Sequence, residues 1–400
     1  MRIAVAVCNY LPYRAGITNV AERHAHHLEA IGHKVTVLCP AHDQAPGSDV
    51  VDGIHVRRFR QAVRHGNSAL TPTIARGLVD ADALYLHYPF FGGAESLALA
   101  AFARGVPVVT FFHMDVIRSG LEGRVLWAYE CSIARIIMER SAVVFASSLD
   151  YARHSSIRRY RLPQLEAFPY CVDASGYAPG AVPEATRRRL GIDPQRGVIL
   201  FVGAMDGGHA FKGVPELISA VSSADLVERA QLVLVGDGDL RPTFERQATA
   251  SLGTDGACFL GRLPEDDLKT VLRAADVLVL PSTTQEEAFG IVLIEAQASG
   301  TPVVASALPG VRELVTEDTG RLVPPRDVPA LADAIGDLVS DPDLLRSLSS
   351  HARRRAVEHF SHERERRQLE ETFGSLPSKT RPRMARIRSR FGSREPADRP

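Results

Sequence analysis

Two carboxylates at a fixed spacing are the residues of this sequence best suited to chemistry. Glu287 and Glu295 are eight positions apart, and every residue between them is apolar or glycine. An apolar run at 277–280 predicts a buried strand before them, and a helical pattern begins near Gly290. Eight positions is slightly more than two helical turns, so the carboxylates would lie roughly on one side, about 12 Å apart along the axis. The free amides of a helix N-terminus, which attract anions, would lie between them.

This arrangement suits a ligand with hydroxyl groups at both ends and phosphate in the middle, which is the shape of a nucleotide sugar. Two glutamates at this spacing also occur by chance in surface helices, but the uncharged residues between them argue against a solvated charged face. Lys212 follows a strand predicted at 198–203, where its ammonium could offset the charge of a diphosphate; a solvated loop lysine is the alternative. Gly16, after the first strand, would let the backbone approach a ligand closely. No G-x-G-x-x-G follows that strand, which counts against a dinucleotide enzyme.

The stretch EEAFGIVLIEAQASGTPVVAS at 286–306 resembles the E-x(7)-E signature of the retaining glycosyltransferases of family 4. The resemblance covers about residues 1–375. It implies an α/β chain of the GT-B fold, in which two Rossmann-like doubly wound domains face each other across a cleft. It also implies transfer of a hexosyl group, with retention of configuration, from a nucleotide diphosphate sugar to a saccharide or lipid-linked acceptor. GDP-mannose and UDP-hexoses are both open as donors, and no metal or other cofactor is implied.

The resemblance implies a role for each residue around the predicted helix start. Lys212 and the amides of Phe289, Gly290 and Ile291 would stabilise the charge that gathers on the leaving diphosphate. Glu287 would position the sugar hydroxyls and support the positively charged anomeric carbon.

The resemblance places further donor contacts elsewhere in the chain. Glu295 would bind the ribose hydroxyls, and the segment with Arg262 and Leu263 would read the base through backbone groups. Gly16 lies where the family has a glycine beside the donor phosphate and the acceptor. The family usually has an arginine directly after the glycine that ends the 198–203 strand. Ala204 stands there in this chain, which leaves the first phosphate contact in question.

Two histidines and an aspartate are candidates in the N-terminal half. His113, in the run FFHMD, resembles the strand-end histidine that contacts the donor sugar in the family. Asp115 could orient it or touch the acceptor, and His87, at the end of the preceding strand, could line the acceptor pocket. A lone histidine is more often structural.

A D-x-D sequence, Asp237 and Asp239, holds a metal in another glycosyltransferase fold. In this chain it closes an apolar strand and precedes a helix, so we expect a turn with a helix N-cap. The five cysteines are scattered, and no two have the spacing of metal ligands. The sequence therefore predicts no metal site.

The order of the elements predicts the domain organisation. Strands and helices alternate, restart after residue 175 and alternate again, which gives two parallel sheets covered on both faces. We expect an acceptor-side domain at 1–175 and a donor domain at 176–360. A helix at 361–375 would cross back to the first domain, and a basic disordered tail would follow at 376–400. A helix at 121–140 could face lipid but is expected to belong to the core.

Composition limits the class of protein. The chain has 400 residues, 45% apolar and 24% charged, as expected of soluble globular proteins. No apolar run approaches the 18 residues of a membrane-spanning helix, and no uniform basic surface for nucleic acid is indicated. We expect a cytoplasmic protein, with contact of the basic tail at the inner membrane face as an open alternative. A nucleotide-sugar epimerase and a non-catalytic nucleotide-sugar-binding protein remain alternatives for the function.

Overall fold

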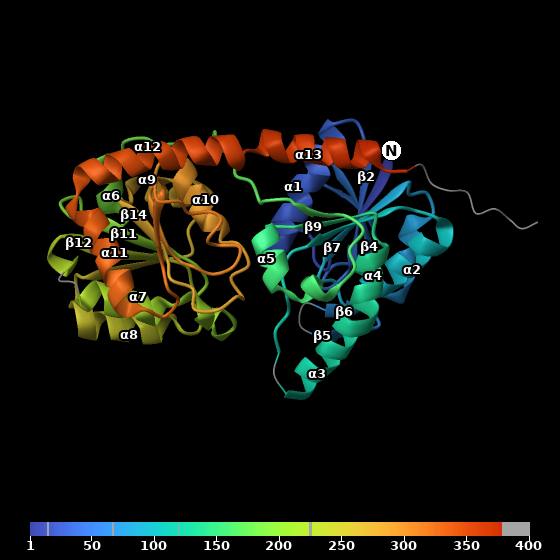
Figure 1. Cartoon of the computed structure of the whole chain (residues 1–400), viewed down its shortest axis with the longest axis horizontal. Coiled ribbons are helices and arrows are strands. Elements are labelled where there is room, and N and C mark those ends of the chain that lie inside the picture. Colours follow the sequence, from blue (N-terminus) through green and yellow to red (C-terminus); the bar gives the residue numbers. More distant parts are fainter. Residues whose placement is uncertain (14–15, 66–67, 119, 224–225, 378–400) are drawn as a thin grey trace, which may run out of the picture.

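The computed structural model describes residues 1–13, 16–65, 68–118, 120–223 and 226–377, and it contains two α/β halves (Figure 1). The first half is built on an eight-stranded sheet in the order β10-β9-β8-β7-β1-β2-β4-β3. Its strands are β1 (Arg2–Ala6), β2 (Lys34–Pro40), β3 (Gly47–Val51), β4 (Ile54–Phe59), β7 (Ala83–Tyr88), β8 (Val108–Phe112), β9 (Val143–Ala146) and β10 (Leu165–Ala167). All neighbours pair in parallel except β3, which runs antiparallel to β4. A short hairpin, β5 (Val63–His65) and β6 (Ser68–Leu70), stands apart.

The second half is built on a six-stranded, fully parallel sheet in the order β13-β12-β11-β14-β15-β16. Its strands are β11 (Gly197–Val202), β12 (Ala230–Val235), β13 (Ala257–Gly261), β14 (Val277–Leu280), β15 (Val303–Ser306) and β16 (Gly320–Val323). The central strands are buried on both faces, which is why they read as continuous apolar runs in the sequence.

Helices cover both sheets (Figure 1). Those of the first half are α1 (Gly16–Ala30), α2 (Ala94–Arg104), α3 (Gly120–Tyr129), α4 (Arg135–Arg140) and α5 (Leu149–His154). Those of the second half are α6 (Glu184–Arg189), α7 (Val214–Ser223), α8 (Arg241–Leu252), α9 (Glu265–Ala274), α10 (Ile291–Ala298) and α11 (Val328–Ser340). Short turns of 3-10 helix lie at Pro72–Leu78, Ser156–Arg159, Gly207–Lys212 and Leu226–Glu228.

The last two helices connect the halves. α12 (Pro342–His359) lies along the second half, and α13 (His362–Ser375) lies on the first half beside α1 (Figure 1). The break between them lies against the segment that joins the two sheets. There the Val172 amide donates to the Phe360 carbonyl at 2.8 Å, and Val172 also pairs with Ser361. The chain therefore passes between the halves twice at the same place.

Some elements differ from expectation. The strand β3 and the helix α6 were not predicted. β3 is almost wholly exposed and lacks an apolar run, and α6 has no buried residues. The predicted 121–140 helix consists of α3, a π-helical turn at Glu130–Ala134, and α4. α3 buries none of its residues, so the expectation of a core helix was wrong for that part. Most of the predicted tail, 378–400, lies outside the described residues.

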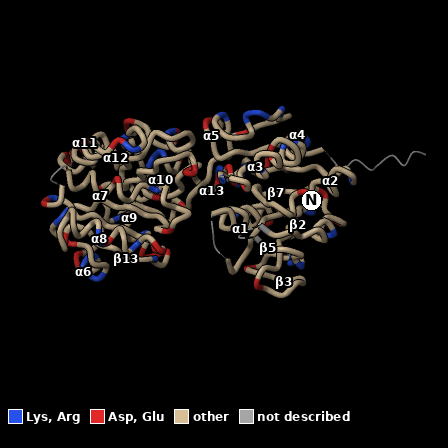
Figure 2. The backbone as a smooth tube through the Cα atoms, turned by 90° about the horizontal axis from the view of Figure 1, so that it is seen from below, with Lys and Arg blue, Asp and Glu red and all other residues tan. Residues whose placement is uncertain are grey.

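Basic and acidic residues are both distributed along the backbone of both halves (Figure 2). Within the described ranges, no helix is long and apolar enough to cross a membrane.

Candidate active site

The site is built where the strand order of the second sheet reverses. β11 pairs with β12 on one side and with β14 on the other, so that Leu200 lies opposite Leu278. The chain proceeds from β11 to β13 in one direction and from β14 to β16 in the other. In doubly wound sheets, ligands bind at such a reversal, outside the C-terminal ends of the strands. The loops 203–213 and 281–290 leave the sheet at this place.

The structure brings together two of the predicted residues, Lys212 and Glu287. The Lys212 ammonium donates to Oε2 of Glu287 at 2.7 Å, and the Ser282 hydroxyl donates to the same oxygen at 3.1 Å. Glu287 is 8% exposed. The Thr283 amide and hydroxyl bind the Phe211 carbonyl at 2.7 and 3.1 Å, which ties the two loops together. A buried carboxylate thus lies beside a cation that is 75 positions away in the sequence.

Two glycines allow the loops to approach this closely. Gly213 has φ +74°, and a Cβ atom there would lie 2.1 Å from the Pro281 carbonyl oxygen. Gly290, directly before α10, has φ +85°, and its Cβ would lie 2.7 Å from Cδ2 of Leu280. A side chain at either position would strain the backbone, and at Gly213 it would also displace the backbone of the loop at Pro281.

The start of α10 leaves backbone donors available. None of the described residues accepts a hydrogen bond from the amides of residues 288–291. These amides lie between Glu287 and Glu295, as predicted, at the positive end of the α10 dipole. Together with Lys212 they form a set of donors that suits an anion.

Glu295 lies on α10 and is half-buried. Burial, together with the nearby Glu265 carboxylate, raises the pKa of Glu295 to about 7, against the influence of Arg23 and Lys269. No described residue donates a hydrogen bond to its carboxylate. Arg23 belongs to α1 of the first half, so this carboxylate lies within electrostatic reach of both halves.

The segments that would meet the nucleotide base are joined through their backbones. The Gly236 amide donates to the Gly261 carbonyl at 2.9 Å. Arg262 is exposed and Leu263 is half-buried. This pair follows β13, which is separated from β14, the strand before Glu287, by the two strands β12 and β11.

The D-x-D aspartates are occupied by backbone amides. Asp237 accepts from the amide of Gly238 at 2.9 Å, and Asp239 accepts from the amide of Gly207 at 3.0 Å. The turn is present as expected, but α8 begins after Leu240 without a side-chain cap, so the N-cap expectation was wrong. Among the described residues, no group of three or more His, Cys, Asp or Glu side chains could hold a metal ion.

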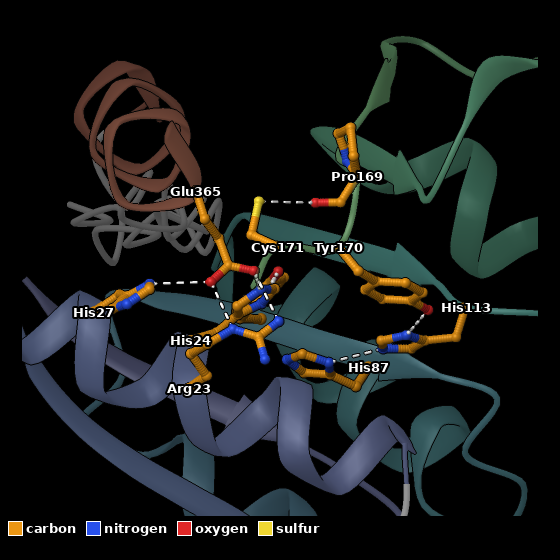
Figure 3. Close-up of polar contacts among 10 residues, drawn as sticks. Arg23, His24, His27, His87, His113, Pro169, Tyr170, Cys171 and Glu365 are labelled. Carbon is orange, nitrogen blue, oxygen red and sulfur yellow. Dashed lines mark hydrogen bonds and ion pairs between the residues drawn. The ribbon is translucent and has the colours of Figure 1, made fainter. Parts of the chain in front are cut away.

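His113 and His87 lie inside the first half (Figure 3). His113 is 2% exposed; its Nδ1 lies 2.7 Å from the Tyr170 hydroxyl and its Nε2 lies 2.9 Å from Nδ1 of His87. Burial lowers the pKa of both imidazoles well below the ordinary value, so both are neutral. His87 is fully buried in this structure, with the Tyr85 and Phe111 rings against it, and its place in the wall of the acceptor pocket stays a prediction. Tyr170 covers His113 in this conformation.

Asp115 and Gly16 lie at the same edge of the first sheet. Asp115 accepts the Ser156 amide at 3.0 and 3.2 Å, and its own amide donates to the Tyr151 hydroxyl at 3.0 Å. It is half-buried and lines a cavity of about 280 Å³. Gly16 is the first residue of α1, and a Cβ there would meet nothing within 4 Å, so the space beside it is open.

Contacts between the halves hold the Glu287 loop from the other side. Phe289 packs edge-on against Tyr170 with ring centroids 5.0 Å apart. Asp150, at the start of α5, accepts from Nε and Nη2 of Arg312 at 2.8 and 2.6 Å and from the Gly310 amide at 3.0 Å. These residues could not be predicted from the sequence, because no local spacing connects position 150 with position 312.

A buried cluster that connects α13 with α1 was not predicted either (Figure 3). Both carboxylate oxygens of Glu365 bind the Arg23 guanidinium, at 2.7 and 3.0 Å. His24 Nε2 lies 3.0 Å and His27 Nδ1 lies 3.2 Å from the same carboxylate. Because α1 carries all three partners and α13 carries the acid, the cluster fixes the last helix on the first half.

Two family models match the chain. The model described as Glycosyltransferase Family 4 matches residues 14–175, and the model described as Glycosyl transferases group 1 matches residues 183–355. A GDP-mannose-dependent alpha-mannosyltransferase of Mycolicibacterium smegmatis is 30% identical over 330 residues, which cover 79% of this chain and 82% of that protein.

Other relatives match over a shorter length. A D-inositol 3-phosphate glycosyltransferase of Corynebacterium urealyticum is 37% identical over 52% of this chain. A GDP-mannose-dependent mannosyltransferase of Corynebacterium glutamicum, which acts on a monoacylated phosphatidylinositol monomannoside, is 34% identical over 48% of this chain. The chain spans about half the length of these two relatives, 50% and 53%.

Solved structures share the fold. Anabaena HepE in complex with UDP has a TM-score of 0.75 at 21% identity and covers 94% of this chain and 100% of that one. Sucrose-phosphate synthase of Thermosynechococcus elongatus has a TM-score of 0.74 at 22% identity and covers 93% and 98%. With the two parallel-sheet halves, these similarities confirm the predicted GT-B fold class. The chain belongs to the family 4 glycosyltransferases.

Proposed function

We propose that this glycosyltransferase moves a hexosyl group from a nucleotide diphosphate sugar to a saccharide or lipid-linked acceptor, with retention of configuration and without a metal ion. The observation that carries the proposal is the ion pair of Lys212 with Glu287, next to unoccupied amides at the start of α10. It combines a cation and a helix N-terminus for phosphate with a carboxylate for sugar hydroxyls.

Each donor group has a proposed partner. Lys212 and the amides of Phe289, Gly290 and Ile291 bind the diphosphate and stabilise the charge that develops as it leaves. When the phosphate binds Lys212, it replaces part of the ion pair between Lys212 and Glu287. The Glu287 carboxylate then accepts hydrogen bonds from sugar hydroxyls. Glu295 accepts the ribose hydroxyls, because no described residue donates a hydrogen bond to it.

The remaining donor contacts belong to backbone segments. The segment with Arg262 and Leu263 contacts the base, and Gly16 leaves space for the phosphate on the side of the first half. His113 positions Tyr170 against Phe289, and direct contact of His113 with the sugar requires the Tyr170 ring to move. Asp115 faces the acceptor side through the cavity that it lines.

GDP-mannose is the first donor to test. A relative that matches 79% of this chain is named as GDP-mannose-dependent, and so is a relative that matches 48% of it. A UDP-hexose is the second, because UDP is the ligand named for a protein of the same fold.

The test compares Glu287→Gln with Glu286→Gln. Glu286 is the adjacent half-buried acid, and its carboxylate accepts only from the Thr284 hydroxyl among the described residues. We expect GDP or UDP to raise the melting temperature of the wild type and of both variants. We expect hydrolysis of the matching nucleotide sugar to fall at least about 100-fold in Glu287→Gln alone, the loss of an interaction made in the transition state. Equal hydrolysis in the wild type and Glu287→Gln would overturn the assignment.

A further inference from the structure

One helix of the first half leaves its apolar side chains uncovered. α3 has no buried residues, and it lies at the lower end of the first half in Figure 1, away from α12 and α13. Leu121 is 77% exposed, Val125 61% and Trp127 58%. Leu121 and Val125 are one helical turn apart and therefore lie on the same side of α3. Single exposed apolar residues are ordinary, but several on one short helix mark an interaction surface.

A basic segment lies beside this helix. It comprises residues 153–161, and it is joined to the π-helical turn after α3 at Glu130. The Arg159 guanidinium lies 3.4 Å from the Glu130 carboxylate, and the Tyr160 hydroxyl donates to the Glu130 carbonyl at 2.9 Å. All four arginines of the segment are exposed: Arg153, Arg158, Arg159 and Arg161. We call the exposed residues of 120–140 and 153–161 the α3 surface.

The charge of the α3 surface has one predominant sign. Residues 120–140 and 153–161 contain seven arginines and three glutamates, a net formal charge of +4. Two of the glutamates are paired within the surface, Glu130 with Arg159 and Glu139 with Arg135. The surface thus offers uncovered apolar side chains next to an excess of guanidinium groups.

A membrane with anionic lipids fits both properties. Leucine, valine and tryptophan side chains enter the boundary between headgroups and acyl chains, and arginines bind the lipid phosphates. α3 has ten residues and is about 15 Å long, so it can lie in the interface but cannot cross the bilayer. A second copy of the chain fits less well, because a twofold contact would place the arginines of both copies together.

We propose that the α3 surface docks on a bilayer that contains anionic phospholipid. The docking goes beyond the proposed glycosyl transfer and does not depend on it. Its consequence for the acceptor does rest on the proposed function. The cavity that Asp115 lines also has Leu126, Trp127 and Arg158 in its walls. A docked bilayer therefore lies next to the proposed acceptor side, where it presents a lipid-linked acceptor.

Trp127 provides the measurement, because it is the single tryptophan of the chain. Its fluorescence is recorded on the full chain with vesicles of phosphatidylcholine and phosphatidylglycerol, and with vesicles of phosphatidylcholine alone. Entry of α3 into the lipid interface should shift the Trp127 emission to shorter wavelength and shield it from acrylamide. Co-sedimentation with the same vesicles gives the affinity.

Two variants of α3 have matched controls on α2 of the same half. Leu121→Ser removes an apolar contact, and its control is Leu99→Ser, at a leucine of α2 that is 71% exposed. Arg124→Gln removes one exposed cation, and its control is Arg104→Gln, at the exposed end of α2.

A further variant separates the α3 surface from the basic tail. It carries Arg386→Gln, Arg388→Gln and Arg390→Gln together in the full chain. We expect this variant to keep the emission shift of Trp127.

We expect the wild type and both controls to bind the anionic vesicles with the emission shift. Leu121→Ser should weaken vesicle binding about tenfold, the effect of one leucine withdrawn from lipid. Arg124→Gln should weaken it about fivefold, and high salt should weaken binding of the wild type. Donor hydrolysis without vesicles should be unchanged in all variants.

Several outcomes would overturn the proposal. A wild type without an emission shift would do so, as would equal binding by Leu121→Ser and Leu99→Ser. Loss of binding in the tail variant alone would assign the membrane contact to the tail. A dimer that Leu121→Ser dissociates, without vesicle binding, would assign the surface to a second copy. Equal binding to phosphatidylcholine alone would overturn the anionic requirement.

Failure of the proposed function would be recognised separately. A wild type that binds anionic vesicles through α3 but hydrolyses no nucleotide sugar would overturn the proposed glycosyl transfer. It would leave the α3 surface standing as a membrane contact.

Discussion

Asp150 and Arg312 form an ion pair between the two halves of the molecule, 162 positions apart in the sequence. Asp150 also accepts the Gly310 amide, and Gly310 lies against the Ala288 carbonyl in the loop that carries Glu287. Burial disfavours the charged form of Asp150, but the Arg312 guanidinium and the Gly310 amide outweigh it and lower its pKa. The pair therefore fixes the first half against the proposed donor loop.

Asp150→Asn should weaken the contact between the first half and the loop that carries Glu287. A charge-assisted hydrogen bond contributes about 1.5–3 kcal/mol, so we expect kcat/KM for donor hydrolysis to fall about tenfold or more. Glu184→Gln, which breaks the exposed Arg188 pair on α6, is the control and should leave the rate unchanged. An unchanged rate in Asp150→Asn would show that closure does not depend on this pair.

Lys212→Met should separate the structural role of the ion pair from its chemical role. The substitution leaves the buried Glu287 carboxylate with only the Ser282 hydroxyl, which should cost about 1–3 kcal/mol of unfolding free energy. Adding Glu287→Gln removes the unpaired charge and should recover most of that stability in urea denaturation. Donor hydrolysis should be lost in both variants; recovery of hydrolysis in the double variant would contradict the proposed roles.

Glu295 should make stability depend on pH. Its folded-state pKa, raised to about 7 by burial and by Glu265, lies above the unfolded value near 4.3. The contribution of Glu295 to the free energy of unfolding is therefore fully present below about pH 4 and is lost as the pH rises to 7. Glu295→Gln should be more stable than the wild type by about 1–3 kcal/mol at pH 8, while weakening nucleotide binding. Urea denaturation at pH 4.5 and 8 measures the difference in stability between Glu295→Gln and the wild type. Glu358→Gln, at an exposed position of α12, is the control. A difference that does not change with pH would contradict the raised pKa of Glu295.

Glu365→Gln should release α13 from α1. Burial opposes ionisation of Glu365, but His24 and Arg23 outweigh it and hold its pKa well below the ordinary range. The substitution leaves the Arg23 cation without its buried partner, so we expect a loss of about 3 kcal/mol at pH 7. Because the folded pKa is depressed, this loss should shrink as the pH falls below about 4.

Hydrogen exchange at α13 and chemical denaturation check this prediction. Glu363→Gln, an exposed acid on the same helix, is the control. Equal protection of α13 amides in Glu365→Gln and the wild type would show that apolar packing alone holds the helix.

Chelation of metals should not affect transfer. Lys212 and the α10 amides are proposed to stabilise the diphosphate, so EDTA should leave the rate of donor hydrolysis within about twofold. A strict requirement for Mg²⁺ or Mn²⁺ would contradict metal independence and favour a metal site at Asp237 and Asp239.

The local pattern of residue types along the sequence alone predicted many of the strands and helices of this protein. Strands buried on both faces must be apolar throughout, so β1, β8, β11 and β14 could be read from the sequence together with the two parallel sheets. The loop-to-helix transition at residues 281–291 was likewise readable, because the strand, the glycine and the spacing of the two glutamates are all encoded within 20 residues. The boundary predicted at 360/361, before the last helix, likewise lies at the break between α12 and α13.

Only the tertiary structure decided which distant residues meet. The order of strands places β11 beside β14, and this alone brings Lys212 to Glu287. The packing of α13 on α1 pairs Glu365 with Arg23, and the approach of the two halves pairs Asp150 with Arg312. The burial of a polar side chain such as His87 could not be predicted from the sequence, because it depends on rings contributed by neighbouring strands. Local spacing specifies which elements form, whereas contacts between them depend on sheet order and domain approach, which no short stretch of sequence contains.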